Sequence, residues 1–125
     1  MLGDKDVIAT VAVADLGVAR RFYEGVLGLK VVHAEGEEAL TMQSGKSSLM
    51  VYRSRYAGTN KATALNFRVG DAIGHIVSAL QKEGVVFERY DLPDARHDGP
   101  LHLIGSMKVA WFKDPDGNII SVMNT

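Results

Sequence analysis

The chain has 125 residues, 46% of them hydrophobic, which suffices for one buried core but not for two independent domains of ordinary size. Its 14 basic and 15 acidic residues leave a net charge of −1 without a long run of one sign, which argues against a nucleic-acid surface or a polybasic membrane anchor. The absence of cysteine excludes disulfides, thiolate metal sites and thiol nucleophiles. We expect a soluble, unprocessed, cytoplasmic protein with no nucleic-acid or membrane partner.

The first half of the chain, residues 7–54, predicts one βαβββ module. Residues 7–13 alternate in the manner of a strand, and Asp15 is placed to cap the helix that follows. Gly28 ends that helix after about three turns. Three short strands are then expected, separated by turns at Gly36 and Gly45: they span residues 30–35, 39–43 and 48–54.

The second half repeats this order after a linker at residues 55–62 and forms a module over residues 63–123. Asp71 is expected to cap the second helix, and Gly84 to end it. A closing hairpin has its turn at residues 114–117. The elements expected are a strand at 63–69, a helix at 71–83 and strands at 85–90, 107–113 and 118–123.

One segment, Leu92–Gly105, breaks the pattern and is predicted to be a long irregular loop. Such loops often act as lids, so we expect it to lie over the opening of a binding site. Its polar residues include His97 and His102, which we expect to be solvated. A metal cluster or an acid–base pair on this loop is the alternative.

The two halves share residues at a constant offset of 56 positions, as from Val13 to Val69 and from Gly28 to Gly84. The chain is therefore interpreted as one α+β domain, residues 1–125, built from two copies of a βαβββ module. Two like modules that face each other enclose a cleft, and equivalent strands would contribute residues to it from both sides.

Three segments carry a family resemblance: Val13–Leu16, Phe22–Leu29 and Trp111–Asn118, the last being the most specific. Together they make the chain resemble the vicinal oxygen chelate superfamily, which includes glyoxalase I, bleomycin resistance proteins and extradiol dioxygenases. It is most similar to the small bacterial glyoxalase-like proteins. The resemblance implies a cup-shaped mixed sheet built from the paired modules and, as is common in this superfamily, a homodimer.

The resemblance also implies positions for metal ligands, on the first and last strands of each module. Counted by the same spacing from Asp15 and Asp71, the two first-strand positions are Ile8 and Ala64. The last-strand position of the second module is Ser121, and its counterpart within Ser47–Ser54 offers no acid or histidine. Aliphatic side chains have no lone pairs to donate, so we predict no metal and no other cofactor.

The cup without a metal is expected to be an apolar cavity with a few polar groups. Arg68 is the one permanent charge among them and would match an anionic group of a ligand; the alternative is an arginine at a solvent-exposed edge. Trp111 is expected to pack in the core rather than stack on a ligand. The predicted ligand-binding residues are Thr10, Asn66, Arg68, Phe112 and Ser121.

The function predicted from these features is metal-independent binding of a small organic molecule, for sequestration, resistance or sensing. The first alternative is a lyase, isomerase or dioxygenase of the same superfamily, either metal-dependent or metal-independent. A one-residue error in strand register would exchange the faces and misplace the ligands, which keeps this alternative open. A module that binds a protein partner is the third interpretation. The sequence identifies no catalytic residue.

Overall fold

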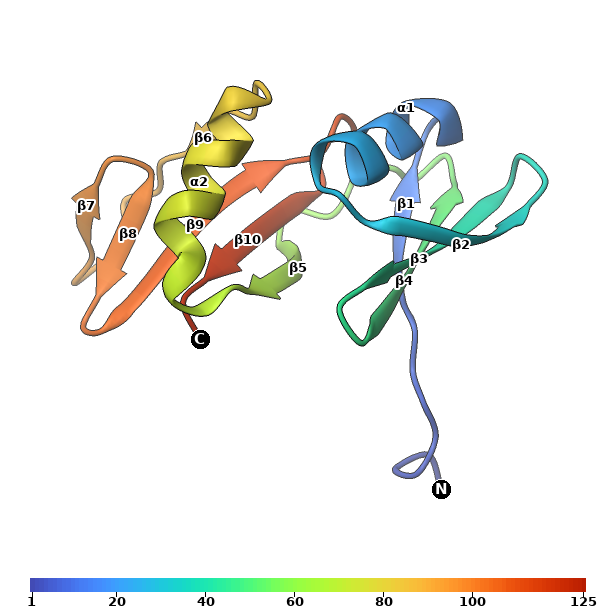
Figure 1. Ribbon diagram of the computed structural model, residues 1–125, viewed down its shortest axis with the longest axis horizontal. Coiled ribbons are helices and arrows are strands. Elements are labelled where there is room, and N and C mark those ends of the chain that lie inside the picture. Colours follow the sequence, from blue (N-terminus) through green and yellow to red (C-terminus); the bar gives the residue numbers. More distant parts are fainter. The chain divides into compact units, whose positions relative to one another are not determined.

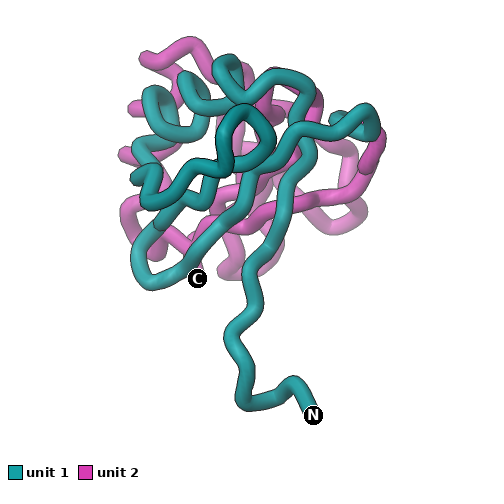
Figure 2. The backbone as a smooth tube through the Cα atoms, turned by 90° about the vertical axis from the view of Figure 1, so that its right-hand side faces the viewer, with its two compact units in different colours: residues 1–58 teal, residues 59–125 magenta.

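The computed structural model describes residues 1–125, which form two compact units, Met1–Gly58 and Thr59–Thr125 (Figure 2). The boundary between the units lies in the segment 55–62, which the sequence marks with Gly58 and Asn60. No helix of the chain is both long enough and apolar enough to cross a lipid bilayer.

Unit 1 is a four-stranded sheet with one helical segment (Figure 1). Its strands lie in the order β1-β4-β3-β2; β1 runs parallel to β4, and the other neighbours are antiparallel. Its elements are β1 (Ala9–Val13), α1 (Leu16–Arg20), the π-helical segment η1 (Arg21–Val26), β2 (Lys30–Glu35), β3 (Ala39–Ser44) and β4 (Ser47–Arg53). This is the predicted βαβββ order.

The helical segment of unit 1 begins and ends where the sequence predicts. The Asp15 carboxylate accepts a hydrogen bond from the Val18 backbone N–H at 2.9 Å, so it caps α1. Gly28 follows the helix with a φ of 80°, a conformation that a side chain would strain. Between them, Ala19 and Tyr23 are buried.

The core of unit 1 follows the alternation of its strands. On β1, Val11 and Val13 are buried, whereas Thr10 between them is exposed. The residues paired or adjacent to these valines on β3 and β4 are buried as well: Leu40, Met42, Leu49 and Val51. Thr10 therefore lies on the sheet face opposite to this core.

Unit 2 is a six-stranded sheet in the order β5-β10-β9-β8-β7, with β6 also paired to β9. Figure 1 shows α2 lying across one face of this sheet. Its elements are β5 (Thr63–Arg68), the 3₁₀ turn η2 (Gly70–Ala72), α2 (Ile73–Lys82), β6 (Phe87–Glu88), β7 (Arg96–Asp98), β8 (Leu101–Ile104), β9 (Met107–Lys113) and β10 (Ile119–Met123). With β5 parallel to β10, the module order of unit 1 recurs, and the predicted α+β fold of two βαβββ modules is confirmed.

The predicted cap at Asp71 is wrong. Gly70, with a φ of 59°, turns the chain into a short 3₁₀ segment that contains Asp71. The helix proper starts only at Ile73, and its N-cap residue, Ala72, makes no side-chain hydrogen bond. Asp71 therefore lies inside the entry turn instead of in front of the helix, although its repeat mate Asp15 is a cap.

The prediction of an irregular loop at Leu92–Gly105 is also wrong. Residues 96–104 form the hairpin β7–β8, which pairs with β9 and widens the sheet. Its two-residue turn is Gly99-Pro100, in which Gly99 has a φ of 58°. The glycines and prolines from which an irregular loop is predicted are thus turn residues between short strands.

Candidate functional site

The turn between β9 and β10 fixes the register of unit 2. The Asp114 carboxylate accepts three hydrogen bonds of 2.8–2.9 Å, from the backbone N–H of Asp116, from the backbone N–H of Asn118 and from the Asn118 side-chain amide. These bonds draw Asn118 into the turn, which therefore spans residues 114–118. Lys113 consequently pairs with Ile119.

With this register, the predicted position of Phe112 on the face of Ser121 is wrong. The expected turn of residues 114–117 would pair Lys113 with Asn118 and so place Phe112 on the face of Ser121. Instead, Ser121 pairs with Trp111, and Phe112 pairs with Ile120 on the opposite face. Phe112 is fully buried there, 5.6 Å from the ring of Phe87. Trp111, and not Phe112, therefore lies on the same face of the sheet as Ser121.

Asn66 and Ser121 are brought together by the pairing of β5 with β10. The Ser121 hydroxyl donates to the Asn66 side-chain oxygen at 2.6 Å, and Ser121 is fully buried. Arg68 lies two residues further along β5, on the same strand face as Asn66, and is exposed. Thr10 is exposed on β1 of unit 1, opposite Met50 of β4.

A pocket of about 230 Å³ opens in unit 2. This volume lies just below the range of roughly 300–1,000 Å³ typical of sites for drug-sized molecules. The indole N–H of Trp111 donates to the Thr63 hydroxyl at 3.2 Å, which joins β9 to the start of β5 on this face. The pocket is lined by Lys61, Ala62, Thr63, Tyr90, Leu92, Trp111 and Ile119.

Two histidines of the β7–β8 hairpin hold Tyr90 in the wall of this pocket. The Tyr90 backbone N–H donates to Nε2 of His102 at 3.0 Å, and Nε2 of His97 lies 3.0 Å from the Tyr90 carbonyl oxygen, to which it donates. His102 is fully buried, and its ring lies 4.9 Å from that of Trp111. The expectation that His102 is solvated is therefore wrong.

The hydrogen bond from Tyr90 determines the tautomer of His102. Because Nε2 accepts, the proton of the neutral ring is on Nδ1, and this buried N–H has no partner in the protein. The ring edges of His97 and His102 meet 4.7 Å apart. Together these contacts position Tyr90 against Trp111, with ring centroids 5.3 Å apart in an edge-to-face arrangement.

The Tyr90 hydroxyl stays protonated at neutral pH. Burial raises its pKa above the ordinary 10.0, the Glu88 carboxylate raises it further, and the Lys113 ammonium opposes the rise. Glu88 and Lys113 form an ion pair at 2.9 Å, and the carboxylate raises the pKa of Lys113. The phenol is thus an available hydrogen-bond donor at the pocket.

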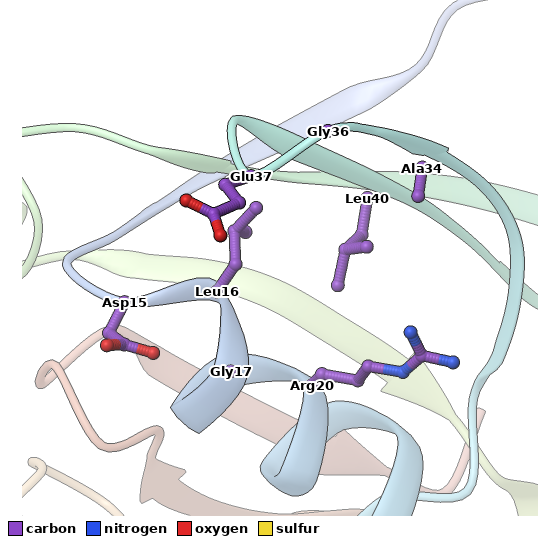
Figure 3. A pocket seen from close by; sticks show the side chains of 8 residues that line it. All are labelled: Asp15, Leu16, Gly17, Arg20, Ala34, Gly36, Glu37 and Leu40. Atoms are coloured by element: carbon purple, nitrogen blue, oxygen red, sulfur yellow. The ribbon is translucent and has the colours of Figure 1, made fainter.

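Unit 1 has a second pocket, of about 340 Å³, between α1 and the β2–β3 turn. Figure 3 shows Leu16 and Leu40 directed into this space, with Arg20 and Glu37 at its edges. Two of its polar groups are engaged elsewhere, because Arg20 pairs with Glu24 at 3.1 Å and Asp15 caps α1. The pocket of unit 2 is the better candidate, because the Lys61 ammonium in its lining forms no ion pair within the protein.

The residues at the implied metal positions do not fit a metal ion. Ile8 and Ala64 have aliphatic side chains, and Ala64 is the extra residue where the β5–β10 register shifts. Ser121 offers a single neutral hydroxyl oxygen, whereas a divalent ion needs several ligands. No three His, Cys, Asp or Glu side chains gather in the structure in a way that could hold an ion.

None of the predicted ligand-binding residues lines this pocket, and its seven lining residues were not among those predicted to bind a ligand: Lys61, Ala62, Thr63, Tyr90, Leu92, Trp111 and Ile119. Trp111 could have been found by counting back from Ser121 across a five-residue turn, since Asp and Asn readily bond backbone groups in turns. Tyr90 carries no such signal, because its place depends on the hydrogen bond to the buried His102. Lys61 lies in the linker, where periodicity gives no information about position.

The fold and the sequence both match known proteins. A sequence model of the Glyoxalase/Bleomycin resistance protein/Dioxygenase superfamily matches residues 7–122. No protein of curated function matches the chain.

Three solved structures illustrate the similarity. A glyoxalase family protein from Enterococcus faecalis is 18% identical, with a TM-score of 0.74 over 98% of this chain and 99% of that one. A lactoylglutathione lyase from Agrobacterium tumefaciens is 16% identical, with a TM-score of 0.72 over 98% and 95%. A fosfomycin resistance protein from Mesorhizobium loti is 16% identical, with a TM-score of 0.70 over 100% and 94%. At these identities the likeness concerns the fold.

Proposed function

The chain belongs to the Glyoxalase/Bleomycin resistance protein/Dioxygenase superfamily, and on that basis we propose that it binds a small organic molecule without a metal ion. The observation that carries the proposal is the pocket of unit 2. Its wall combines Tyr90, Trp111 and Leu92 with the Lys61 ammonium and the Thr63 hydroxyl. Small-molecule sites generally have this composition, apolar walls with a small number of polar groups that fix orientation.

The proposal of metal-independent binding is supported by the side chains at the implied ligand positions. Ile8 and Ala64 cannot donate an electron pair, and Ser121 supplies a single neutral oxygen where a divalent ion needs several ligands. Sequestration, resistance or sensing needs only binding, which this site can provide. That Thr10 and Arg68 bind ligand remains part of the proposal, as are the homodimer and the cytoplasmic location.

A metal-independent lyase or isomerase is the second candidate. The feature that favours it is the Tyr90 hydroxyl, which is protonated, makes no hydrogen bond within the protein and lies in the pocket wall. Such a phenol can donate a proton to a substrate oxygen. One structural neighbour is named a lactoylglutathione lyase, so at least one protein named as a lyase has this fold. Turnover that Tyr90→Phe abolishes while binding persists would favour the enzyme.

The binding site can be tested by filling each pocket in turn. Ala62 and Ala34 are both exposed, and each lines one pocket only. Compounds that raise the melting temperature of the wild type in the presence of EDTA are titrated against Ala62→Phe and Ala34→Phe. We expect Ala62→Phe to abolish binding and Ala34→Phe to leave it unchanged, whereas the opposite result would assign the site to unit 1.

Elemental analysis and native mass spectrometry of the purified protein test the remaining parts. We expect no stoichiometric divalent metal and a mass of two chains. One Zn, Ni, Mn or Fe per chain that EDTA removes together with ligand binding would contradict the metal-independent proposal. A mass of one chain would contradict the homodimer alone.

A further inference from the structure

We infer that the ligand of the unit 2 pocket is a small planar molecule that carries an acidic group, such as an aromatic carboxylate. This inference rests on the proposed function and specifies the class of ligand. It follows from three features of the site: the aromatic walls, the set of hydrogen-bond donors and the charge at the rim.

The aromatic walls favour a flat, apolar ligand. Trp111 and Tyr90 meet edge to face at 5.3 Å, and both side chains remain partly exposed while lining the pocket. Leu92 and Ile119 complete the apolar lining. A planar ring that enters here can pack on the indole or the phenol in an offset or edge-to-face arrangement, which is worth more than the burial of the same area of aliphatic surface.

The polar groups of the pocket are hydrogen-bond donors. The Tyr90 hydroxyl is protonated and bonds to no group of the protein. The Thr63 oxygen accepts from the Trp111 indole, which leaves the Thr63 hydroxyl hydrogen free to donate. A ligand that matches both groups must supply acceptor oxygens, as a carboxylate does.

The charge at the rim favours an anion. Lys61 lines the pocket, is exposed and belongs to none of the ion pairs of the protein. None of the seven lining residues is acidic. The carboxylate of Glu88, which acts on Tyr90 from β6, is paired with Lys113 at 2.9 Å. The pocket therefore offers one uncompensated positive charge and no negative one.

The inference is tested with three probes of similar size: benzoate, benzamide and cyclohexanecarboxylate. Binding is followed by NMR through the indole N–H of Trp111, the only tryptophan of the chain. We expect benzoate to bind more tightly than benzamide by about 3- to 10-fold, a range typical of a partly exposed charge pair. Benzoate should also bind more tightly than cyclohexanecarboxylate, which has the charge but no planar ring.

Variants separate the contributions. Lys61→Gln should remove the preference for benzoate over benzamide, and Tyr90→Phe should weaken benzoate while it keeps the aromatic wall. Lys82→Gln, an exposed lysine on α2 of the same unit that lines neither pocket, is the matched control and should change nothing.

The possible results distinguish the inference from the proposed function. Equal affinity for benzoate and benzamide, or an unchanged preference in Lys61→Gln, would overturn the acidic class. Tighter binding of cyclohexanecarboxylate than of benzoate would overturn the planar class. A neutral aliphatic compound from the thermal screen that shifts the Trp111 resonance, while benzoate does not, would refute the inference and leave the proposed function standing. If no compound shifts that resonance, the proposed function itself fails.

Discussion

At the scale of single residues, Asp15 and Asp71 occupy equivalent places in the repeat, but only Asp15 caps a helix. The Asp15 carboxylate satisfies an otherwise unpaired N–H of the first turn of α1, whereas Asp71 makes no capping bond. We therefore expect Asp15→Ala to lower the free energy of unfolding by about 1 kcal/mol. Asp71→Ala, the matched control, should change it by less than about 0.5 kcal/mol. Urea denaturation measures both, and equal losses would contradict the difference in capping.

The Tyr90 hydroxyl gives a second prediction at this scale, for alkaline pH. Its pKa is raised in the folded protein, chiefly by burial, so the folded state holds this proton more tightly than the unfolded state does. The associated stability is complete below the ordinary 10.0 and is lost as the pH rises through the raised pKa. We expect Tyr90→Phe to lose less stability than the wild type between about pH 8 and about pH 11.

The control for this pH experiment is Tyr52→Phe, at a partly exposed tyrosine of unit 1. Its stability should fall with pH as steeply as that of the wild type. If Tyr90→Phe and the wild type also fall in parallel, Tyr90 ionises equally well in the folded and unfolded chains. The phenol would then be less shielded than the structure indicates.

At the scale of elements, the β7–β8 hairpin supports the pocket from outside it. His102 accepts the Tyr90 N–H at 3.0 Å and packs against Trp111, so it fixes both aromatic residues of the wall. We expect His102→Ala to cost about 2–4 kcal/mol, since it leaves a cavity and an unpaired backbone donor. Hydrogen exchange at the Tyr90 amide should accelerate at the same time.

His97→Ala provides the comparison for this hairpin. His97 is only half-buried and bonds to the Tyr90 carbonyl, so its loss should cost about 1 kcal/mol and leave exchange at the Tyr90 amide little changed. The Tyr90 amide could instead exchange equally fast in the wild type and in His102→Ala. That result would show that His102 does not hold Tyr90 in solution.

The elements also show what the sequence could and could not predict. The strands with a clear period of two, such as Met107–Lys113, lie within a residue or two of their predicted bounds, because burial on one face imposes that period. The β7–β8 hairpin was missed because each strand is too short to show a period. The register of β9 against β10 depends on whether Asn118 belongs to the turn. Hydrogen bonds to the Asp114 carboxylate decide this, and hydropathy does not reveal them.

At the scale of the whole molecule, the repeat predicts the fold better than it predicts the site. Both units have the βαβββ order, because equivalent strands, helices and glycine stops recur at a fixed spacing. The aromatic residues that form the pocket of unit 2 are not repeated at equivalent positions in unit 1. The pocket depends on Tyr90 and Trp111, on the added β7–β8 hairpin and on Lys61 of the linker, none of which follows from the repeat.

The most direct test of the account is a crystal structure of the protein grown in EDTA with a compound selected by the thermal screen. We predict electron density for that compound against Trp111 and Tyr90, without a metal ion between it and the protein. Density in the pocket beside α1, or a ligand held through a metal ion that survives the EDTA, would contradict metal-independent binding in unit 2.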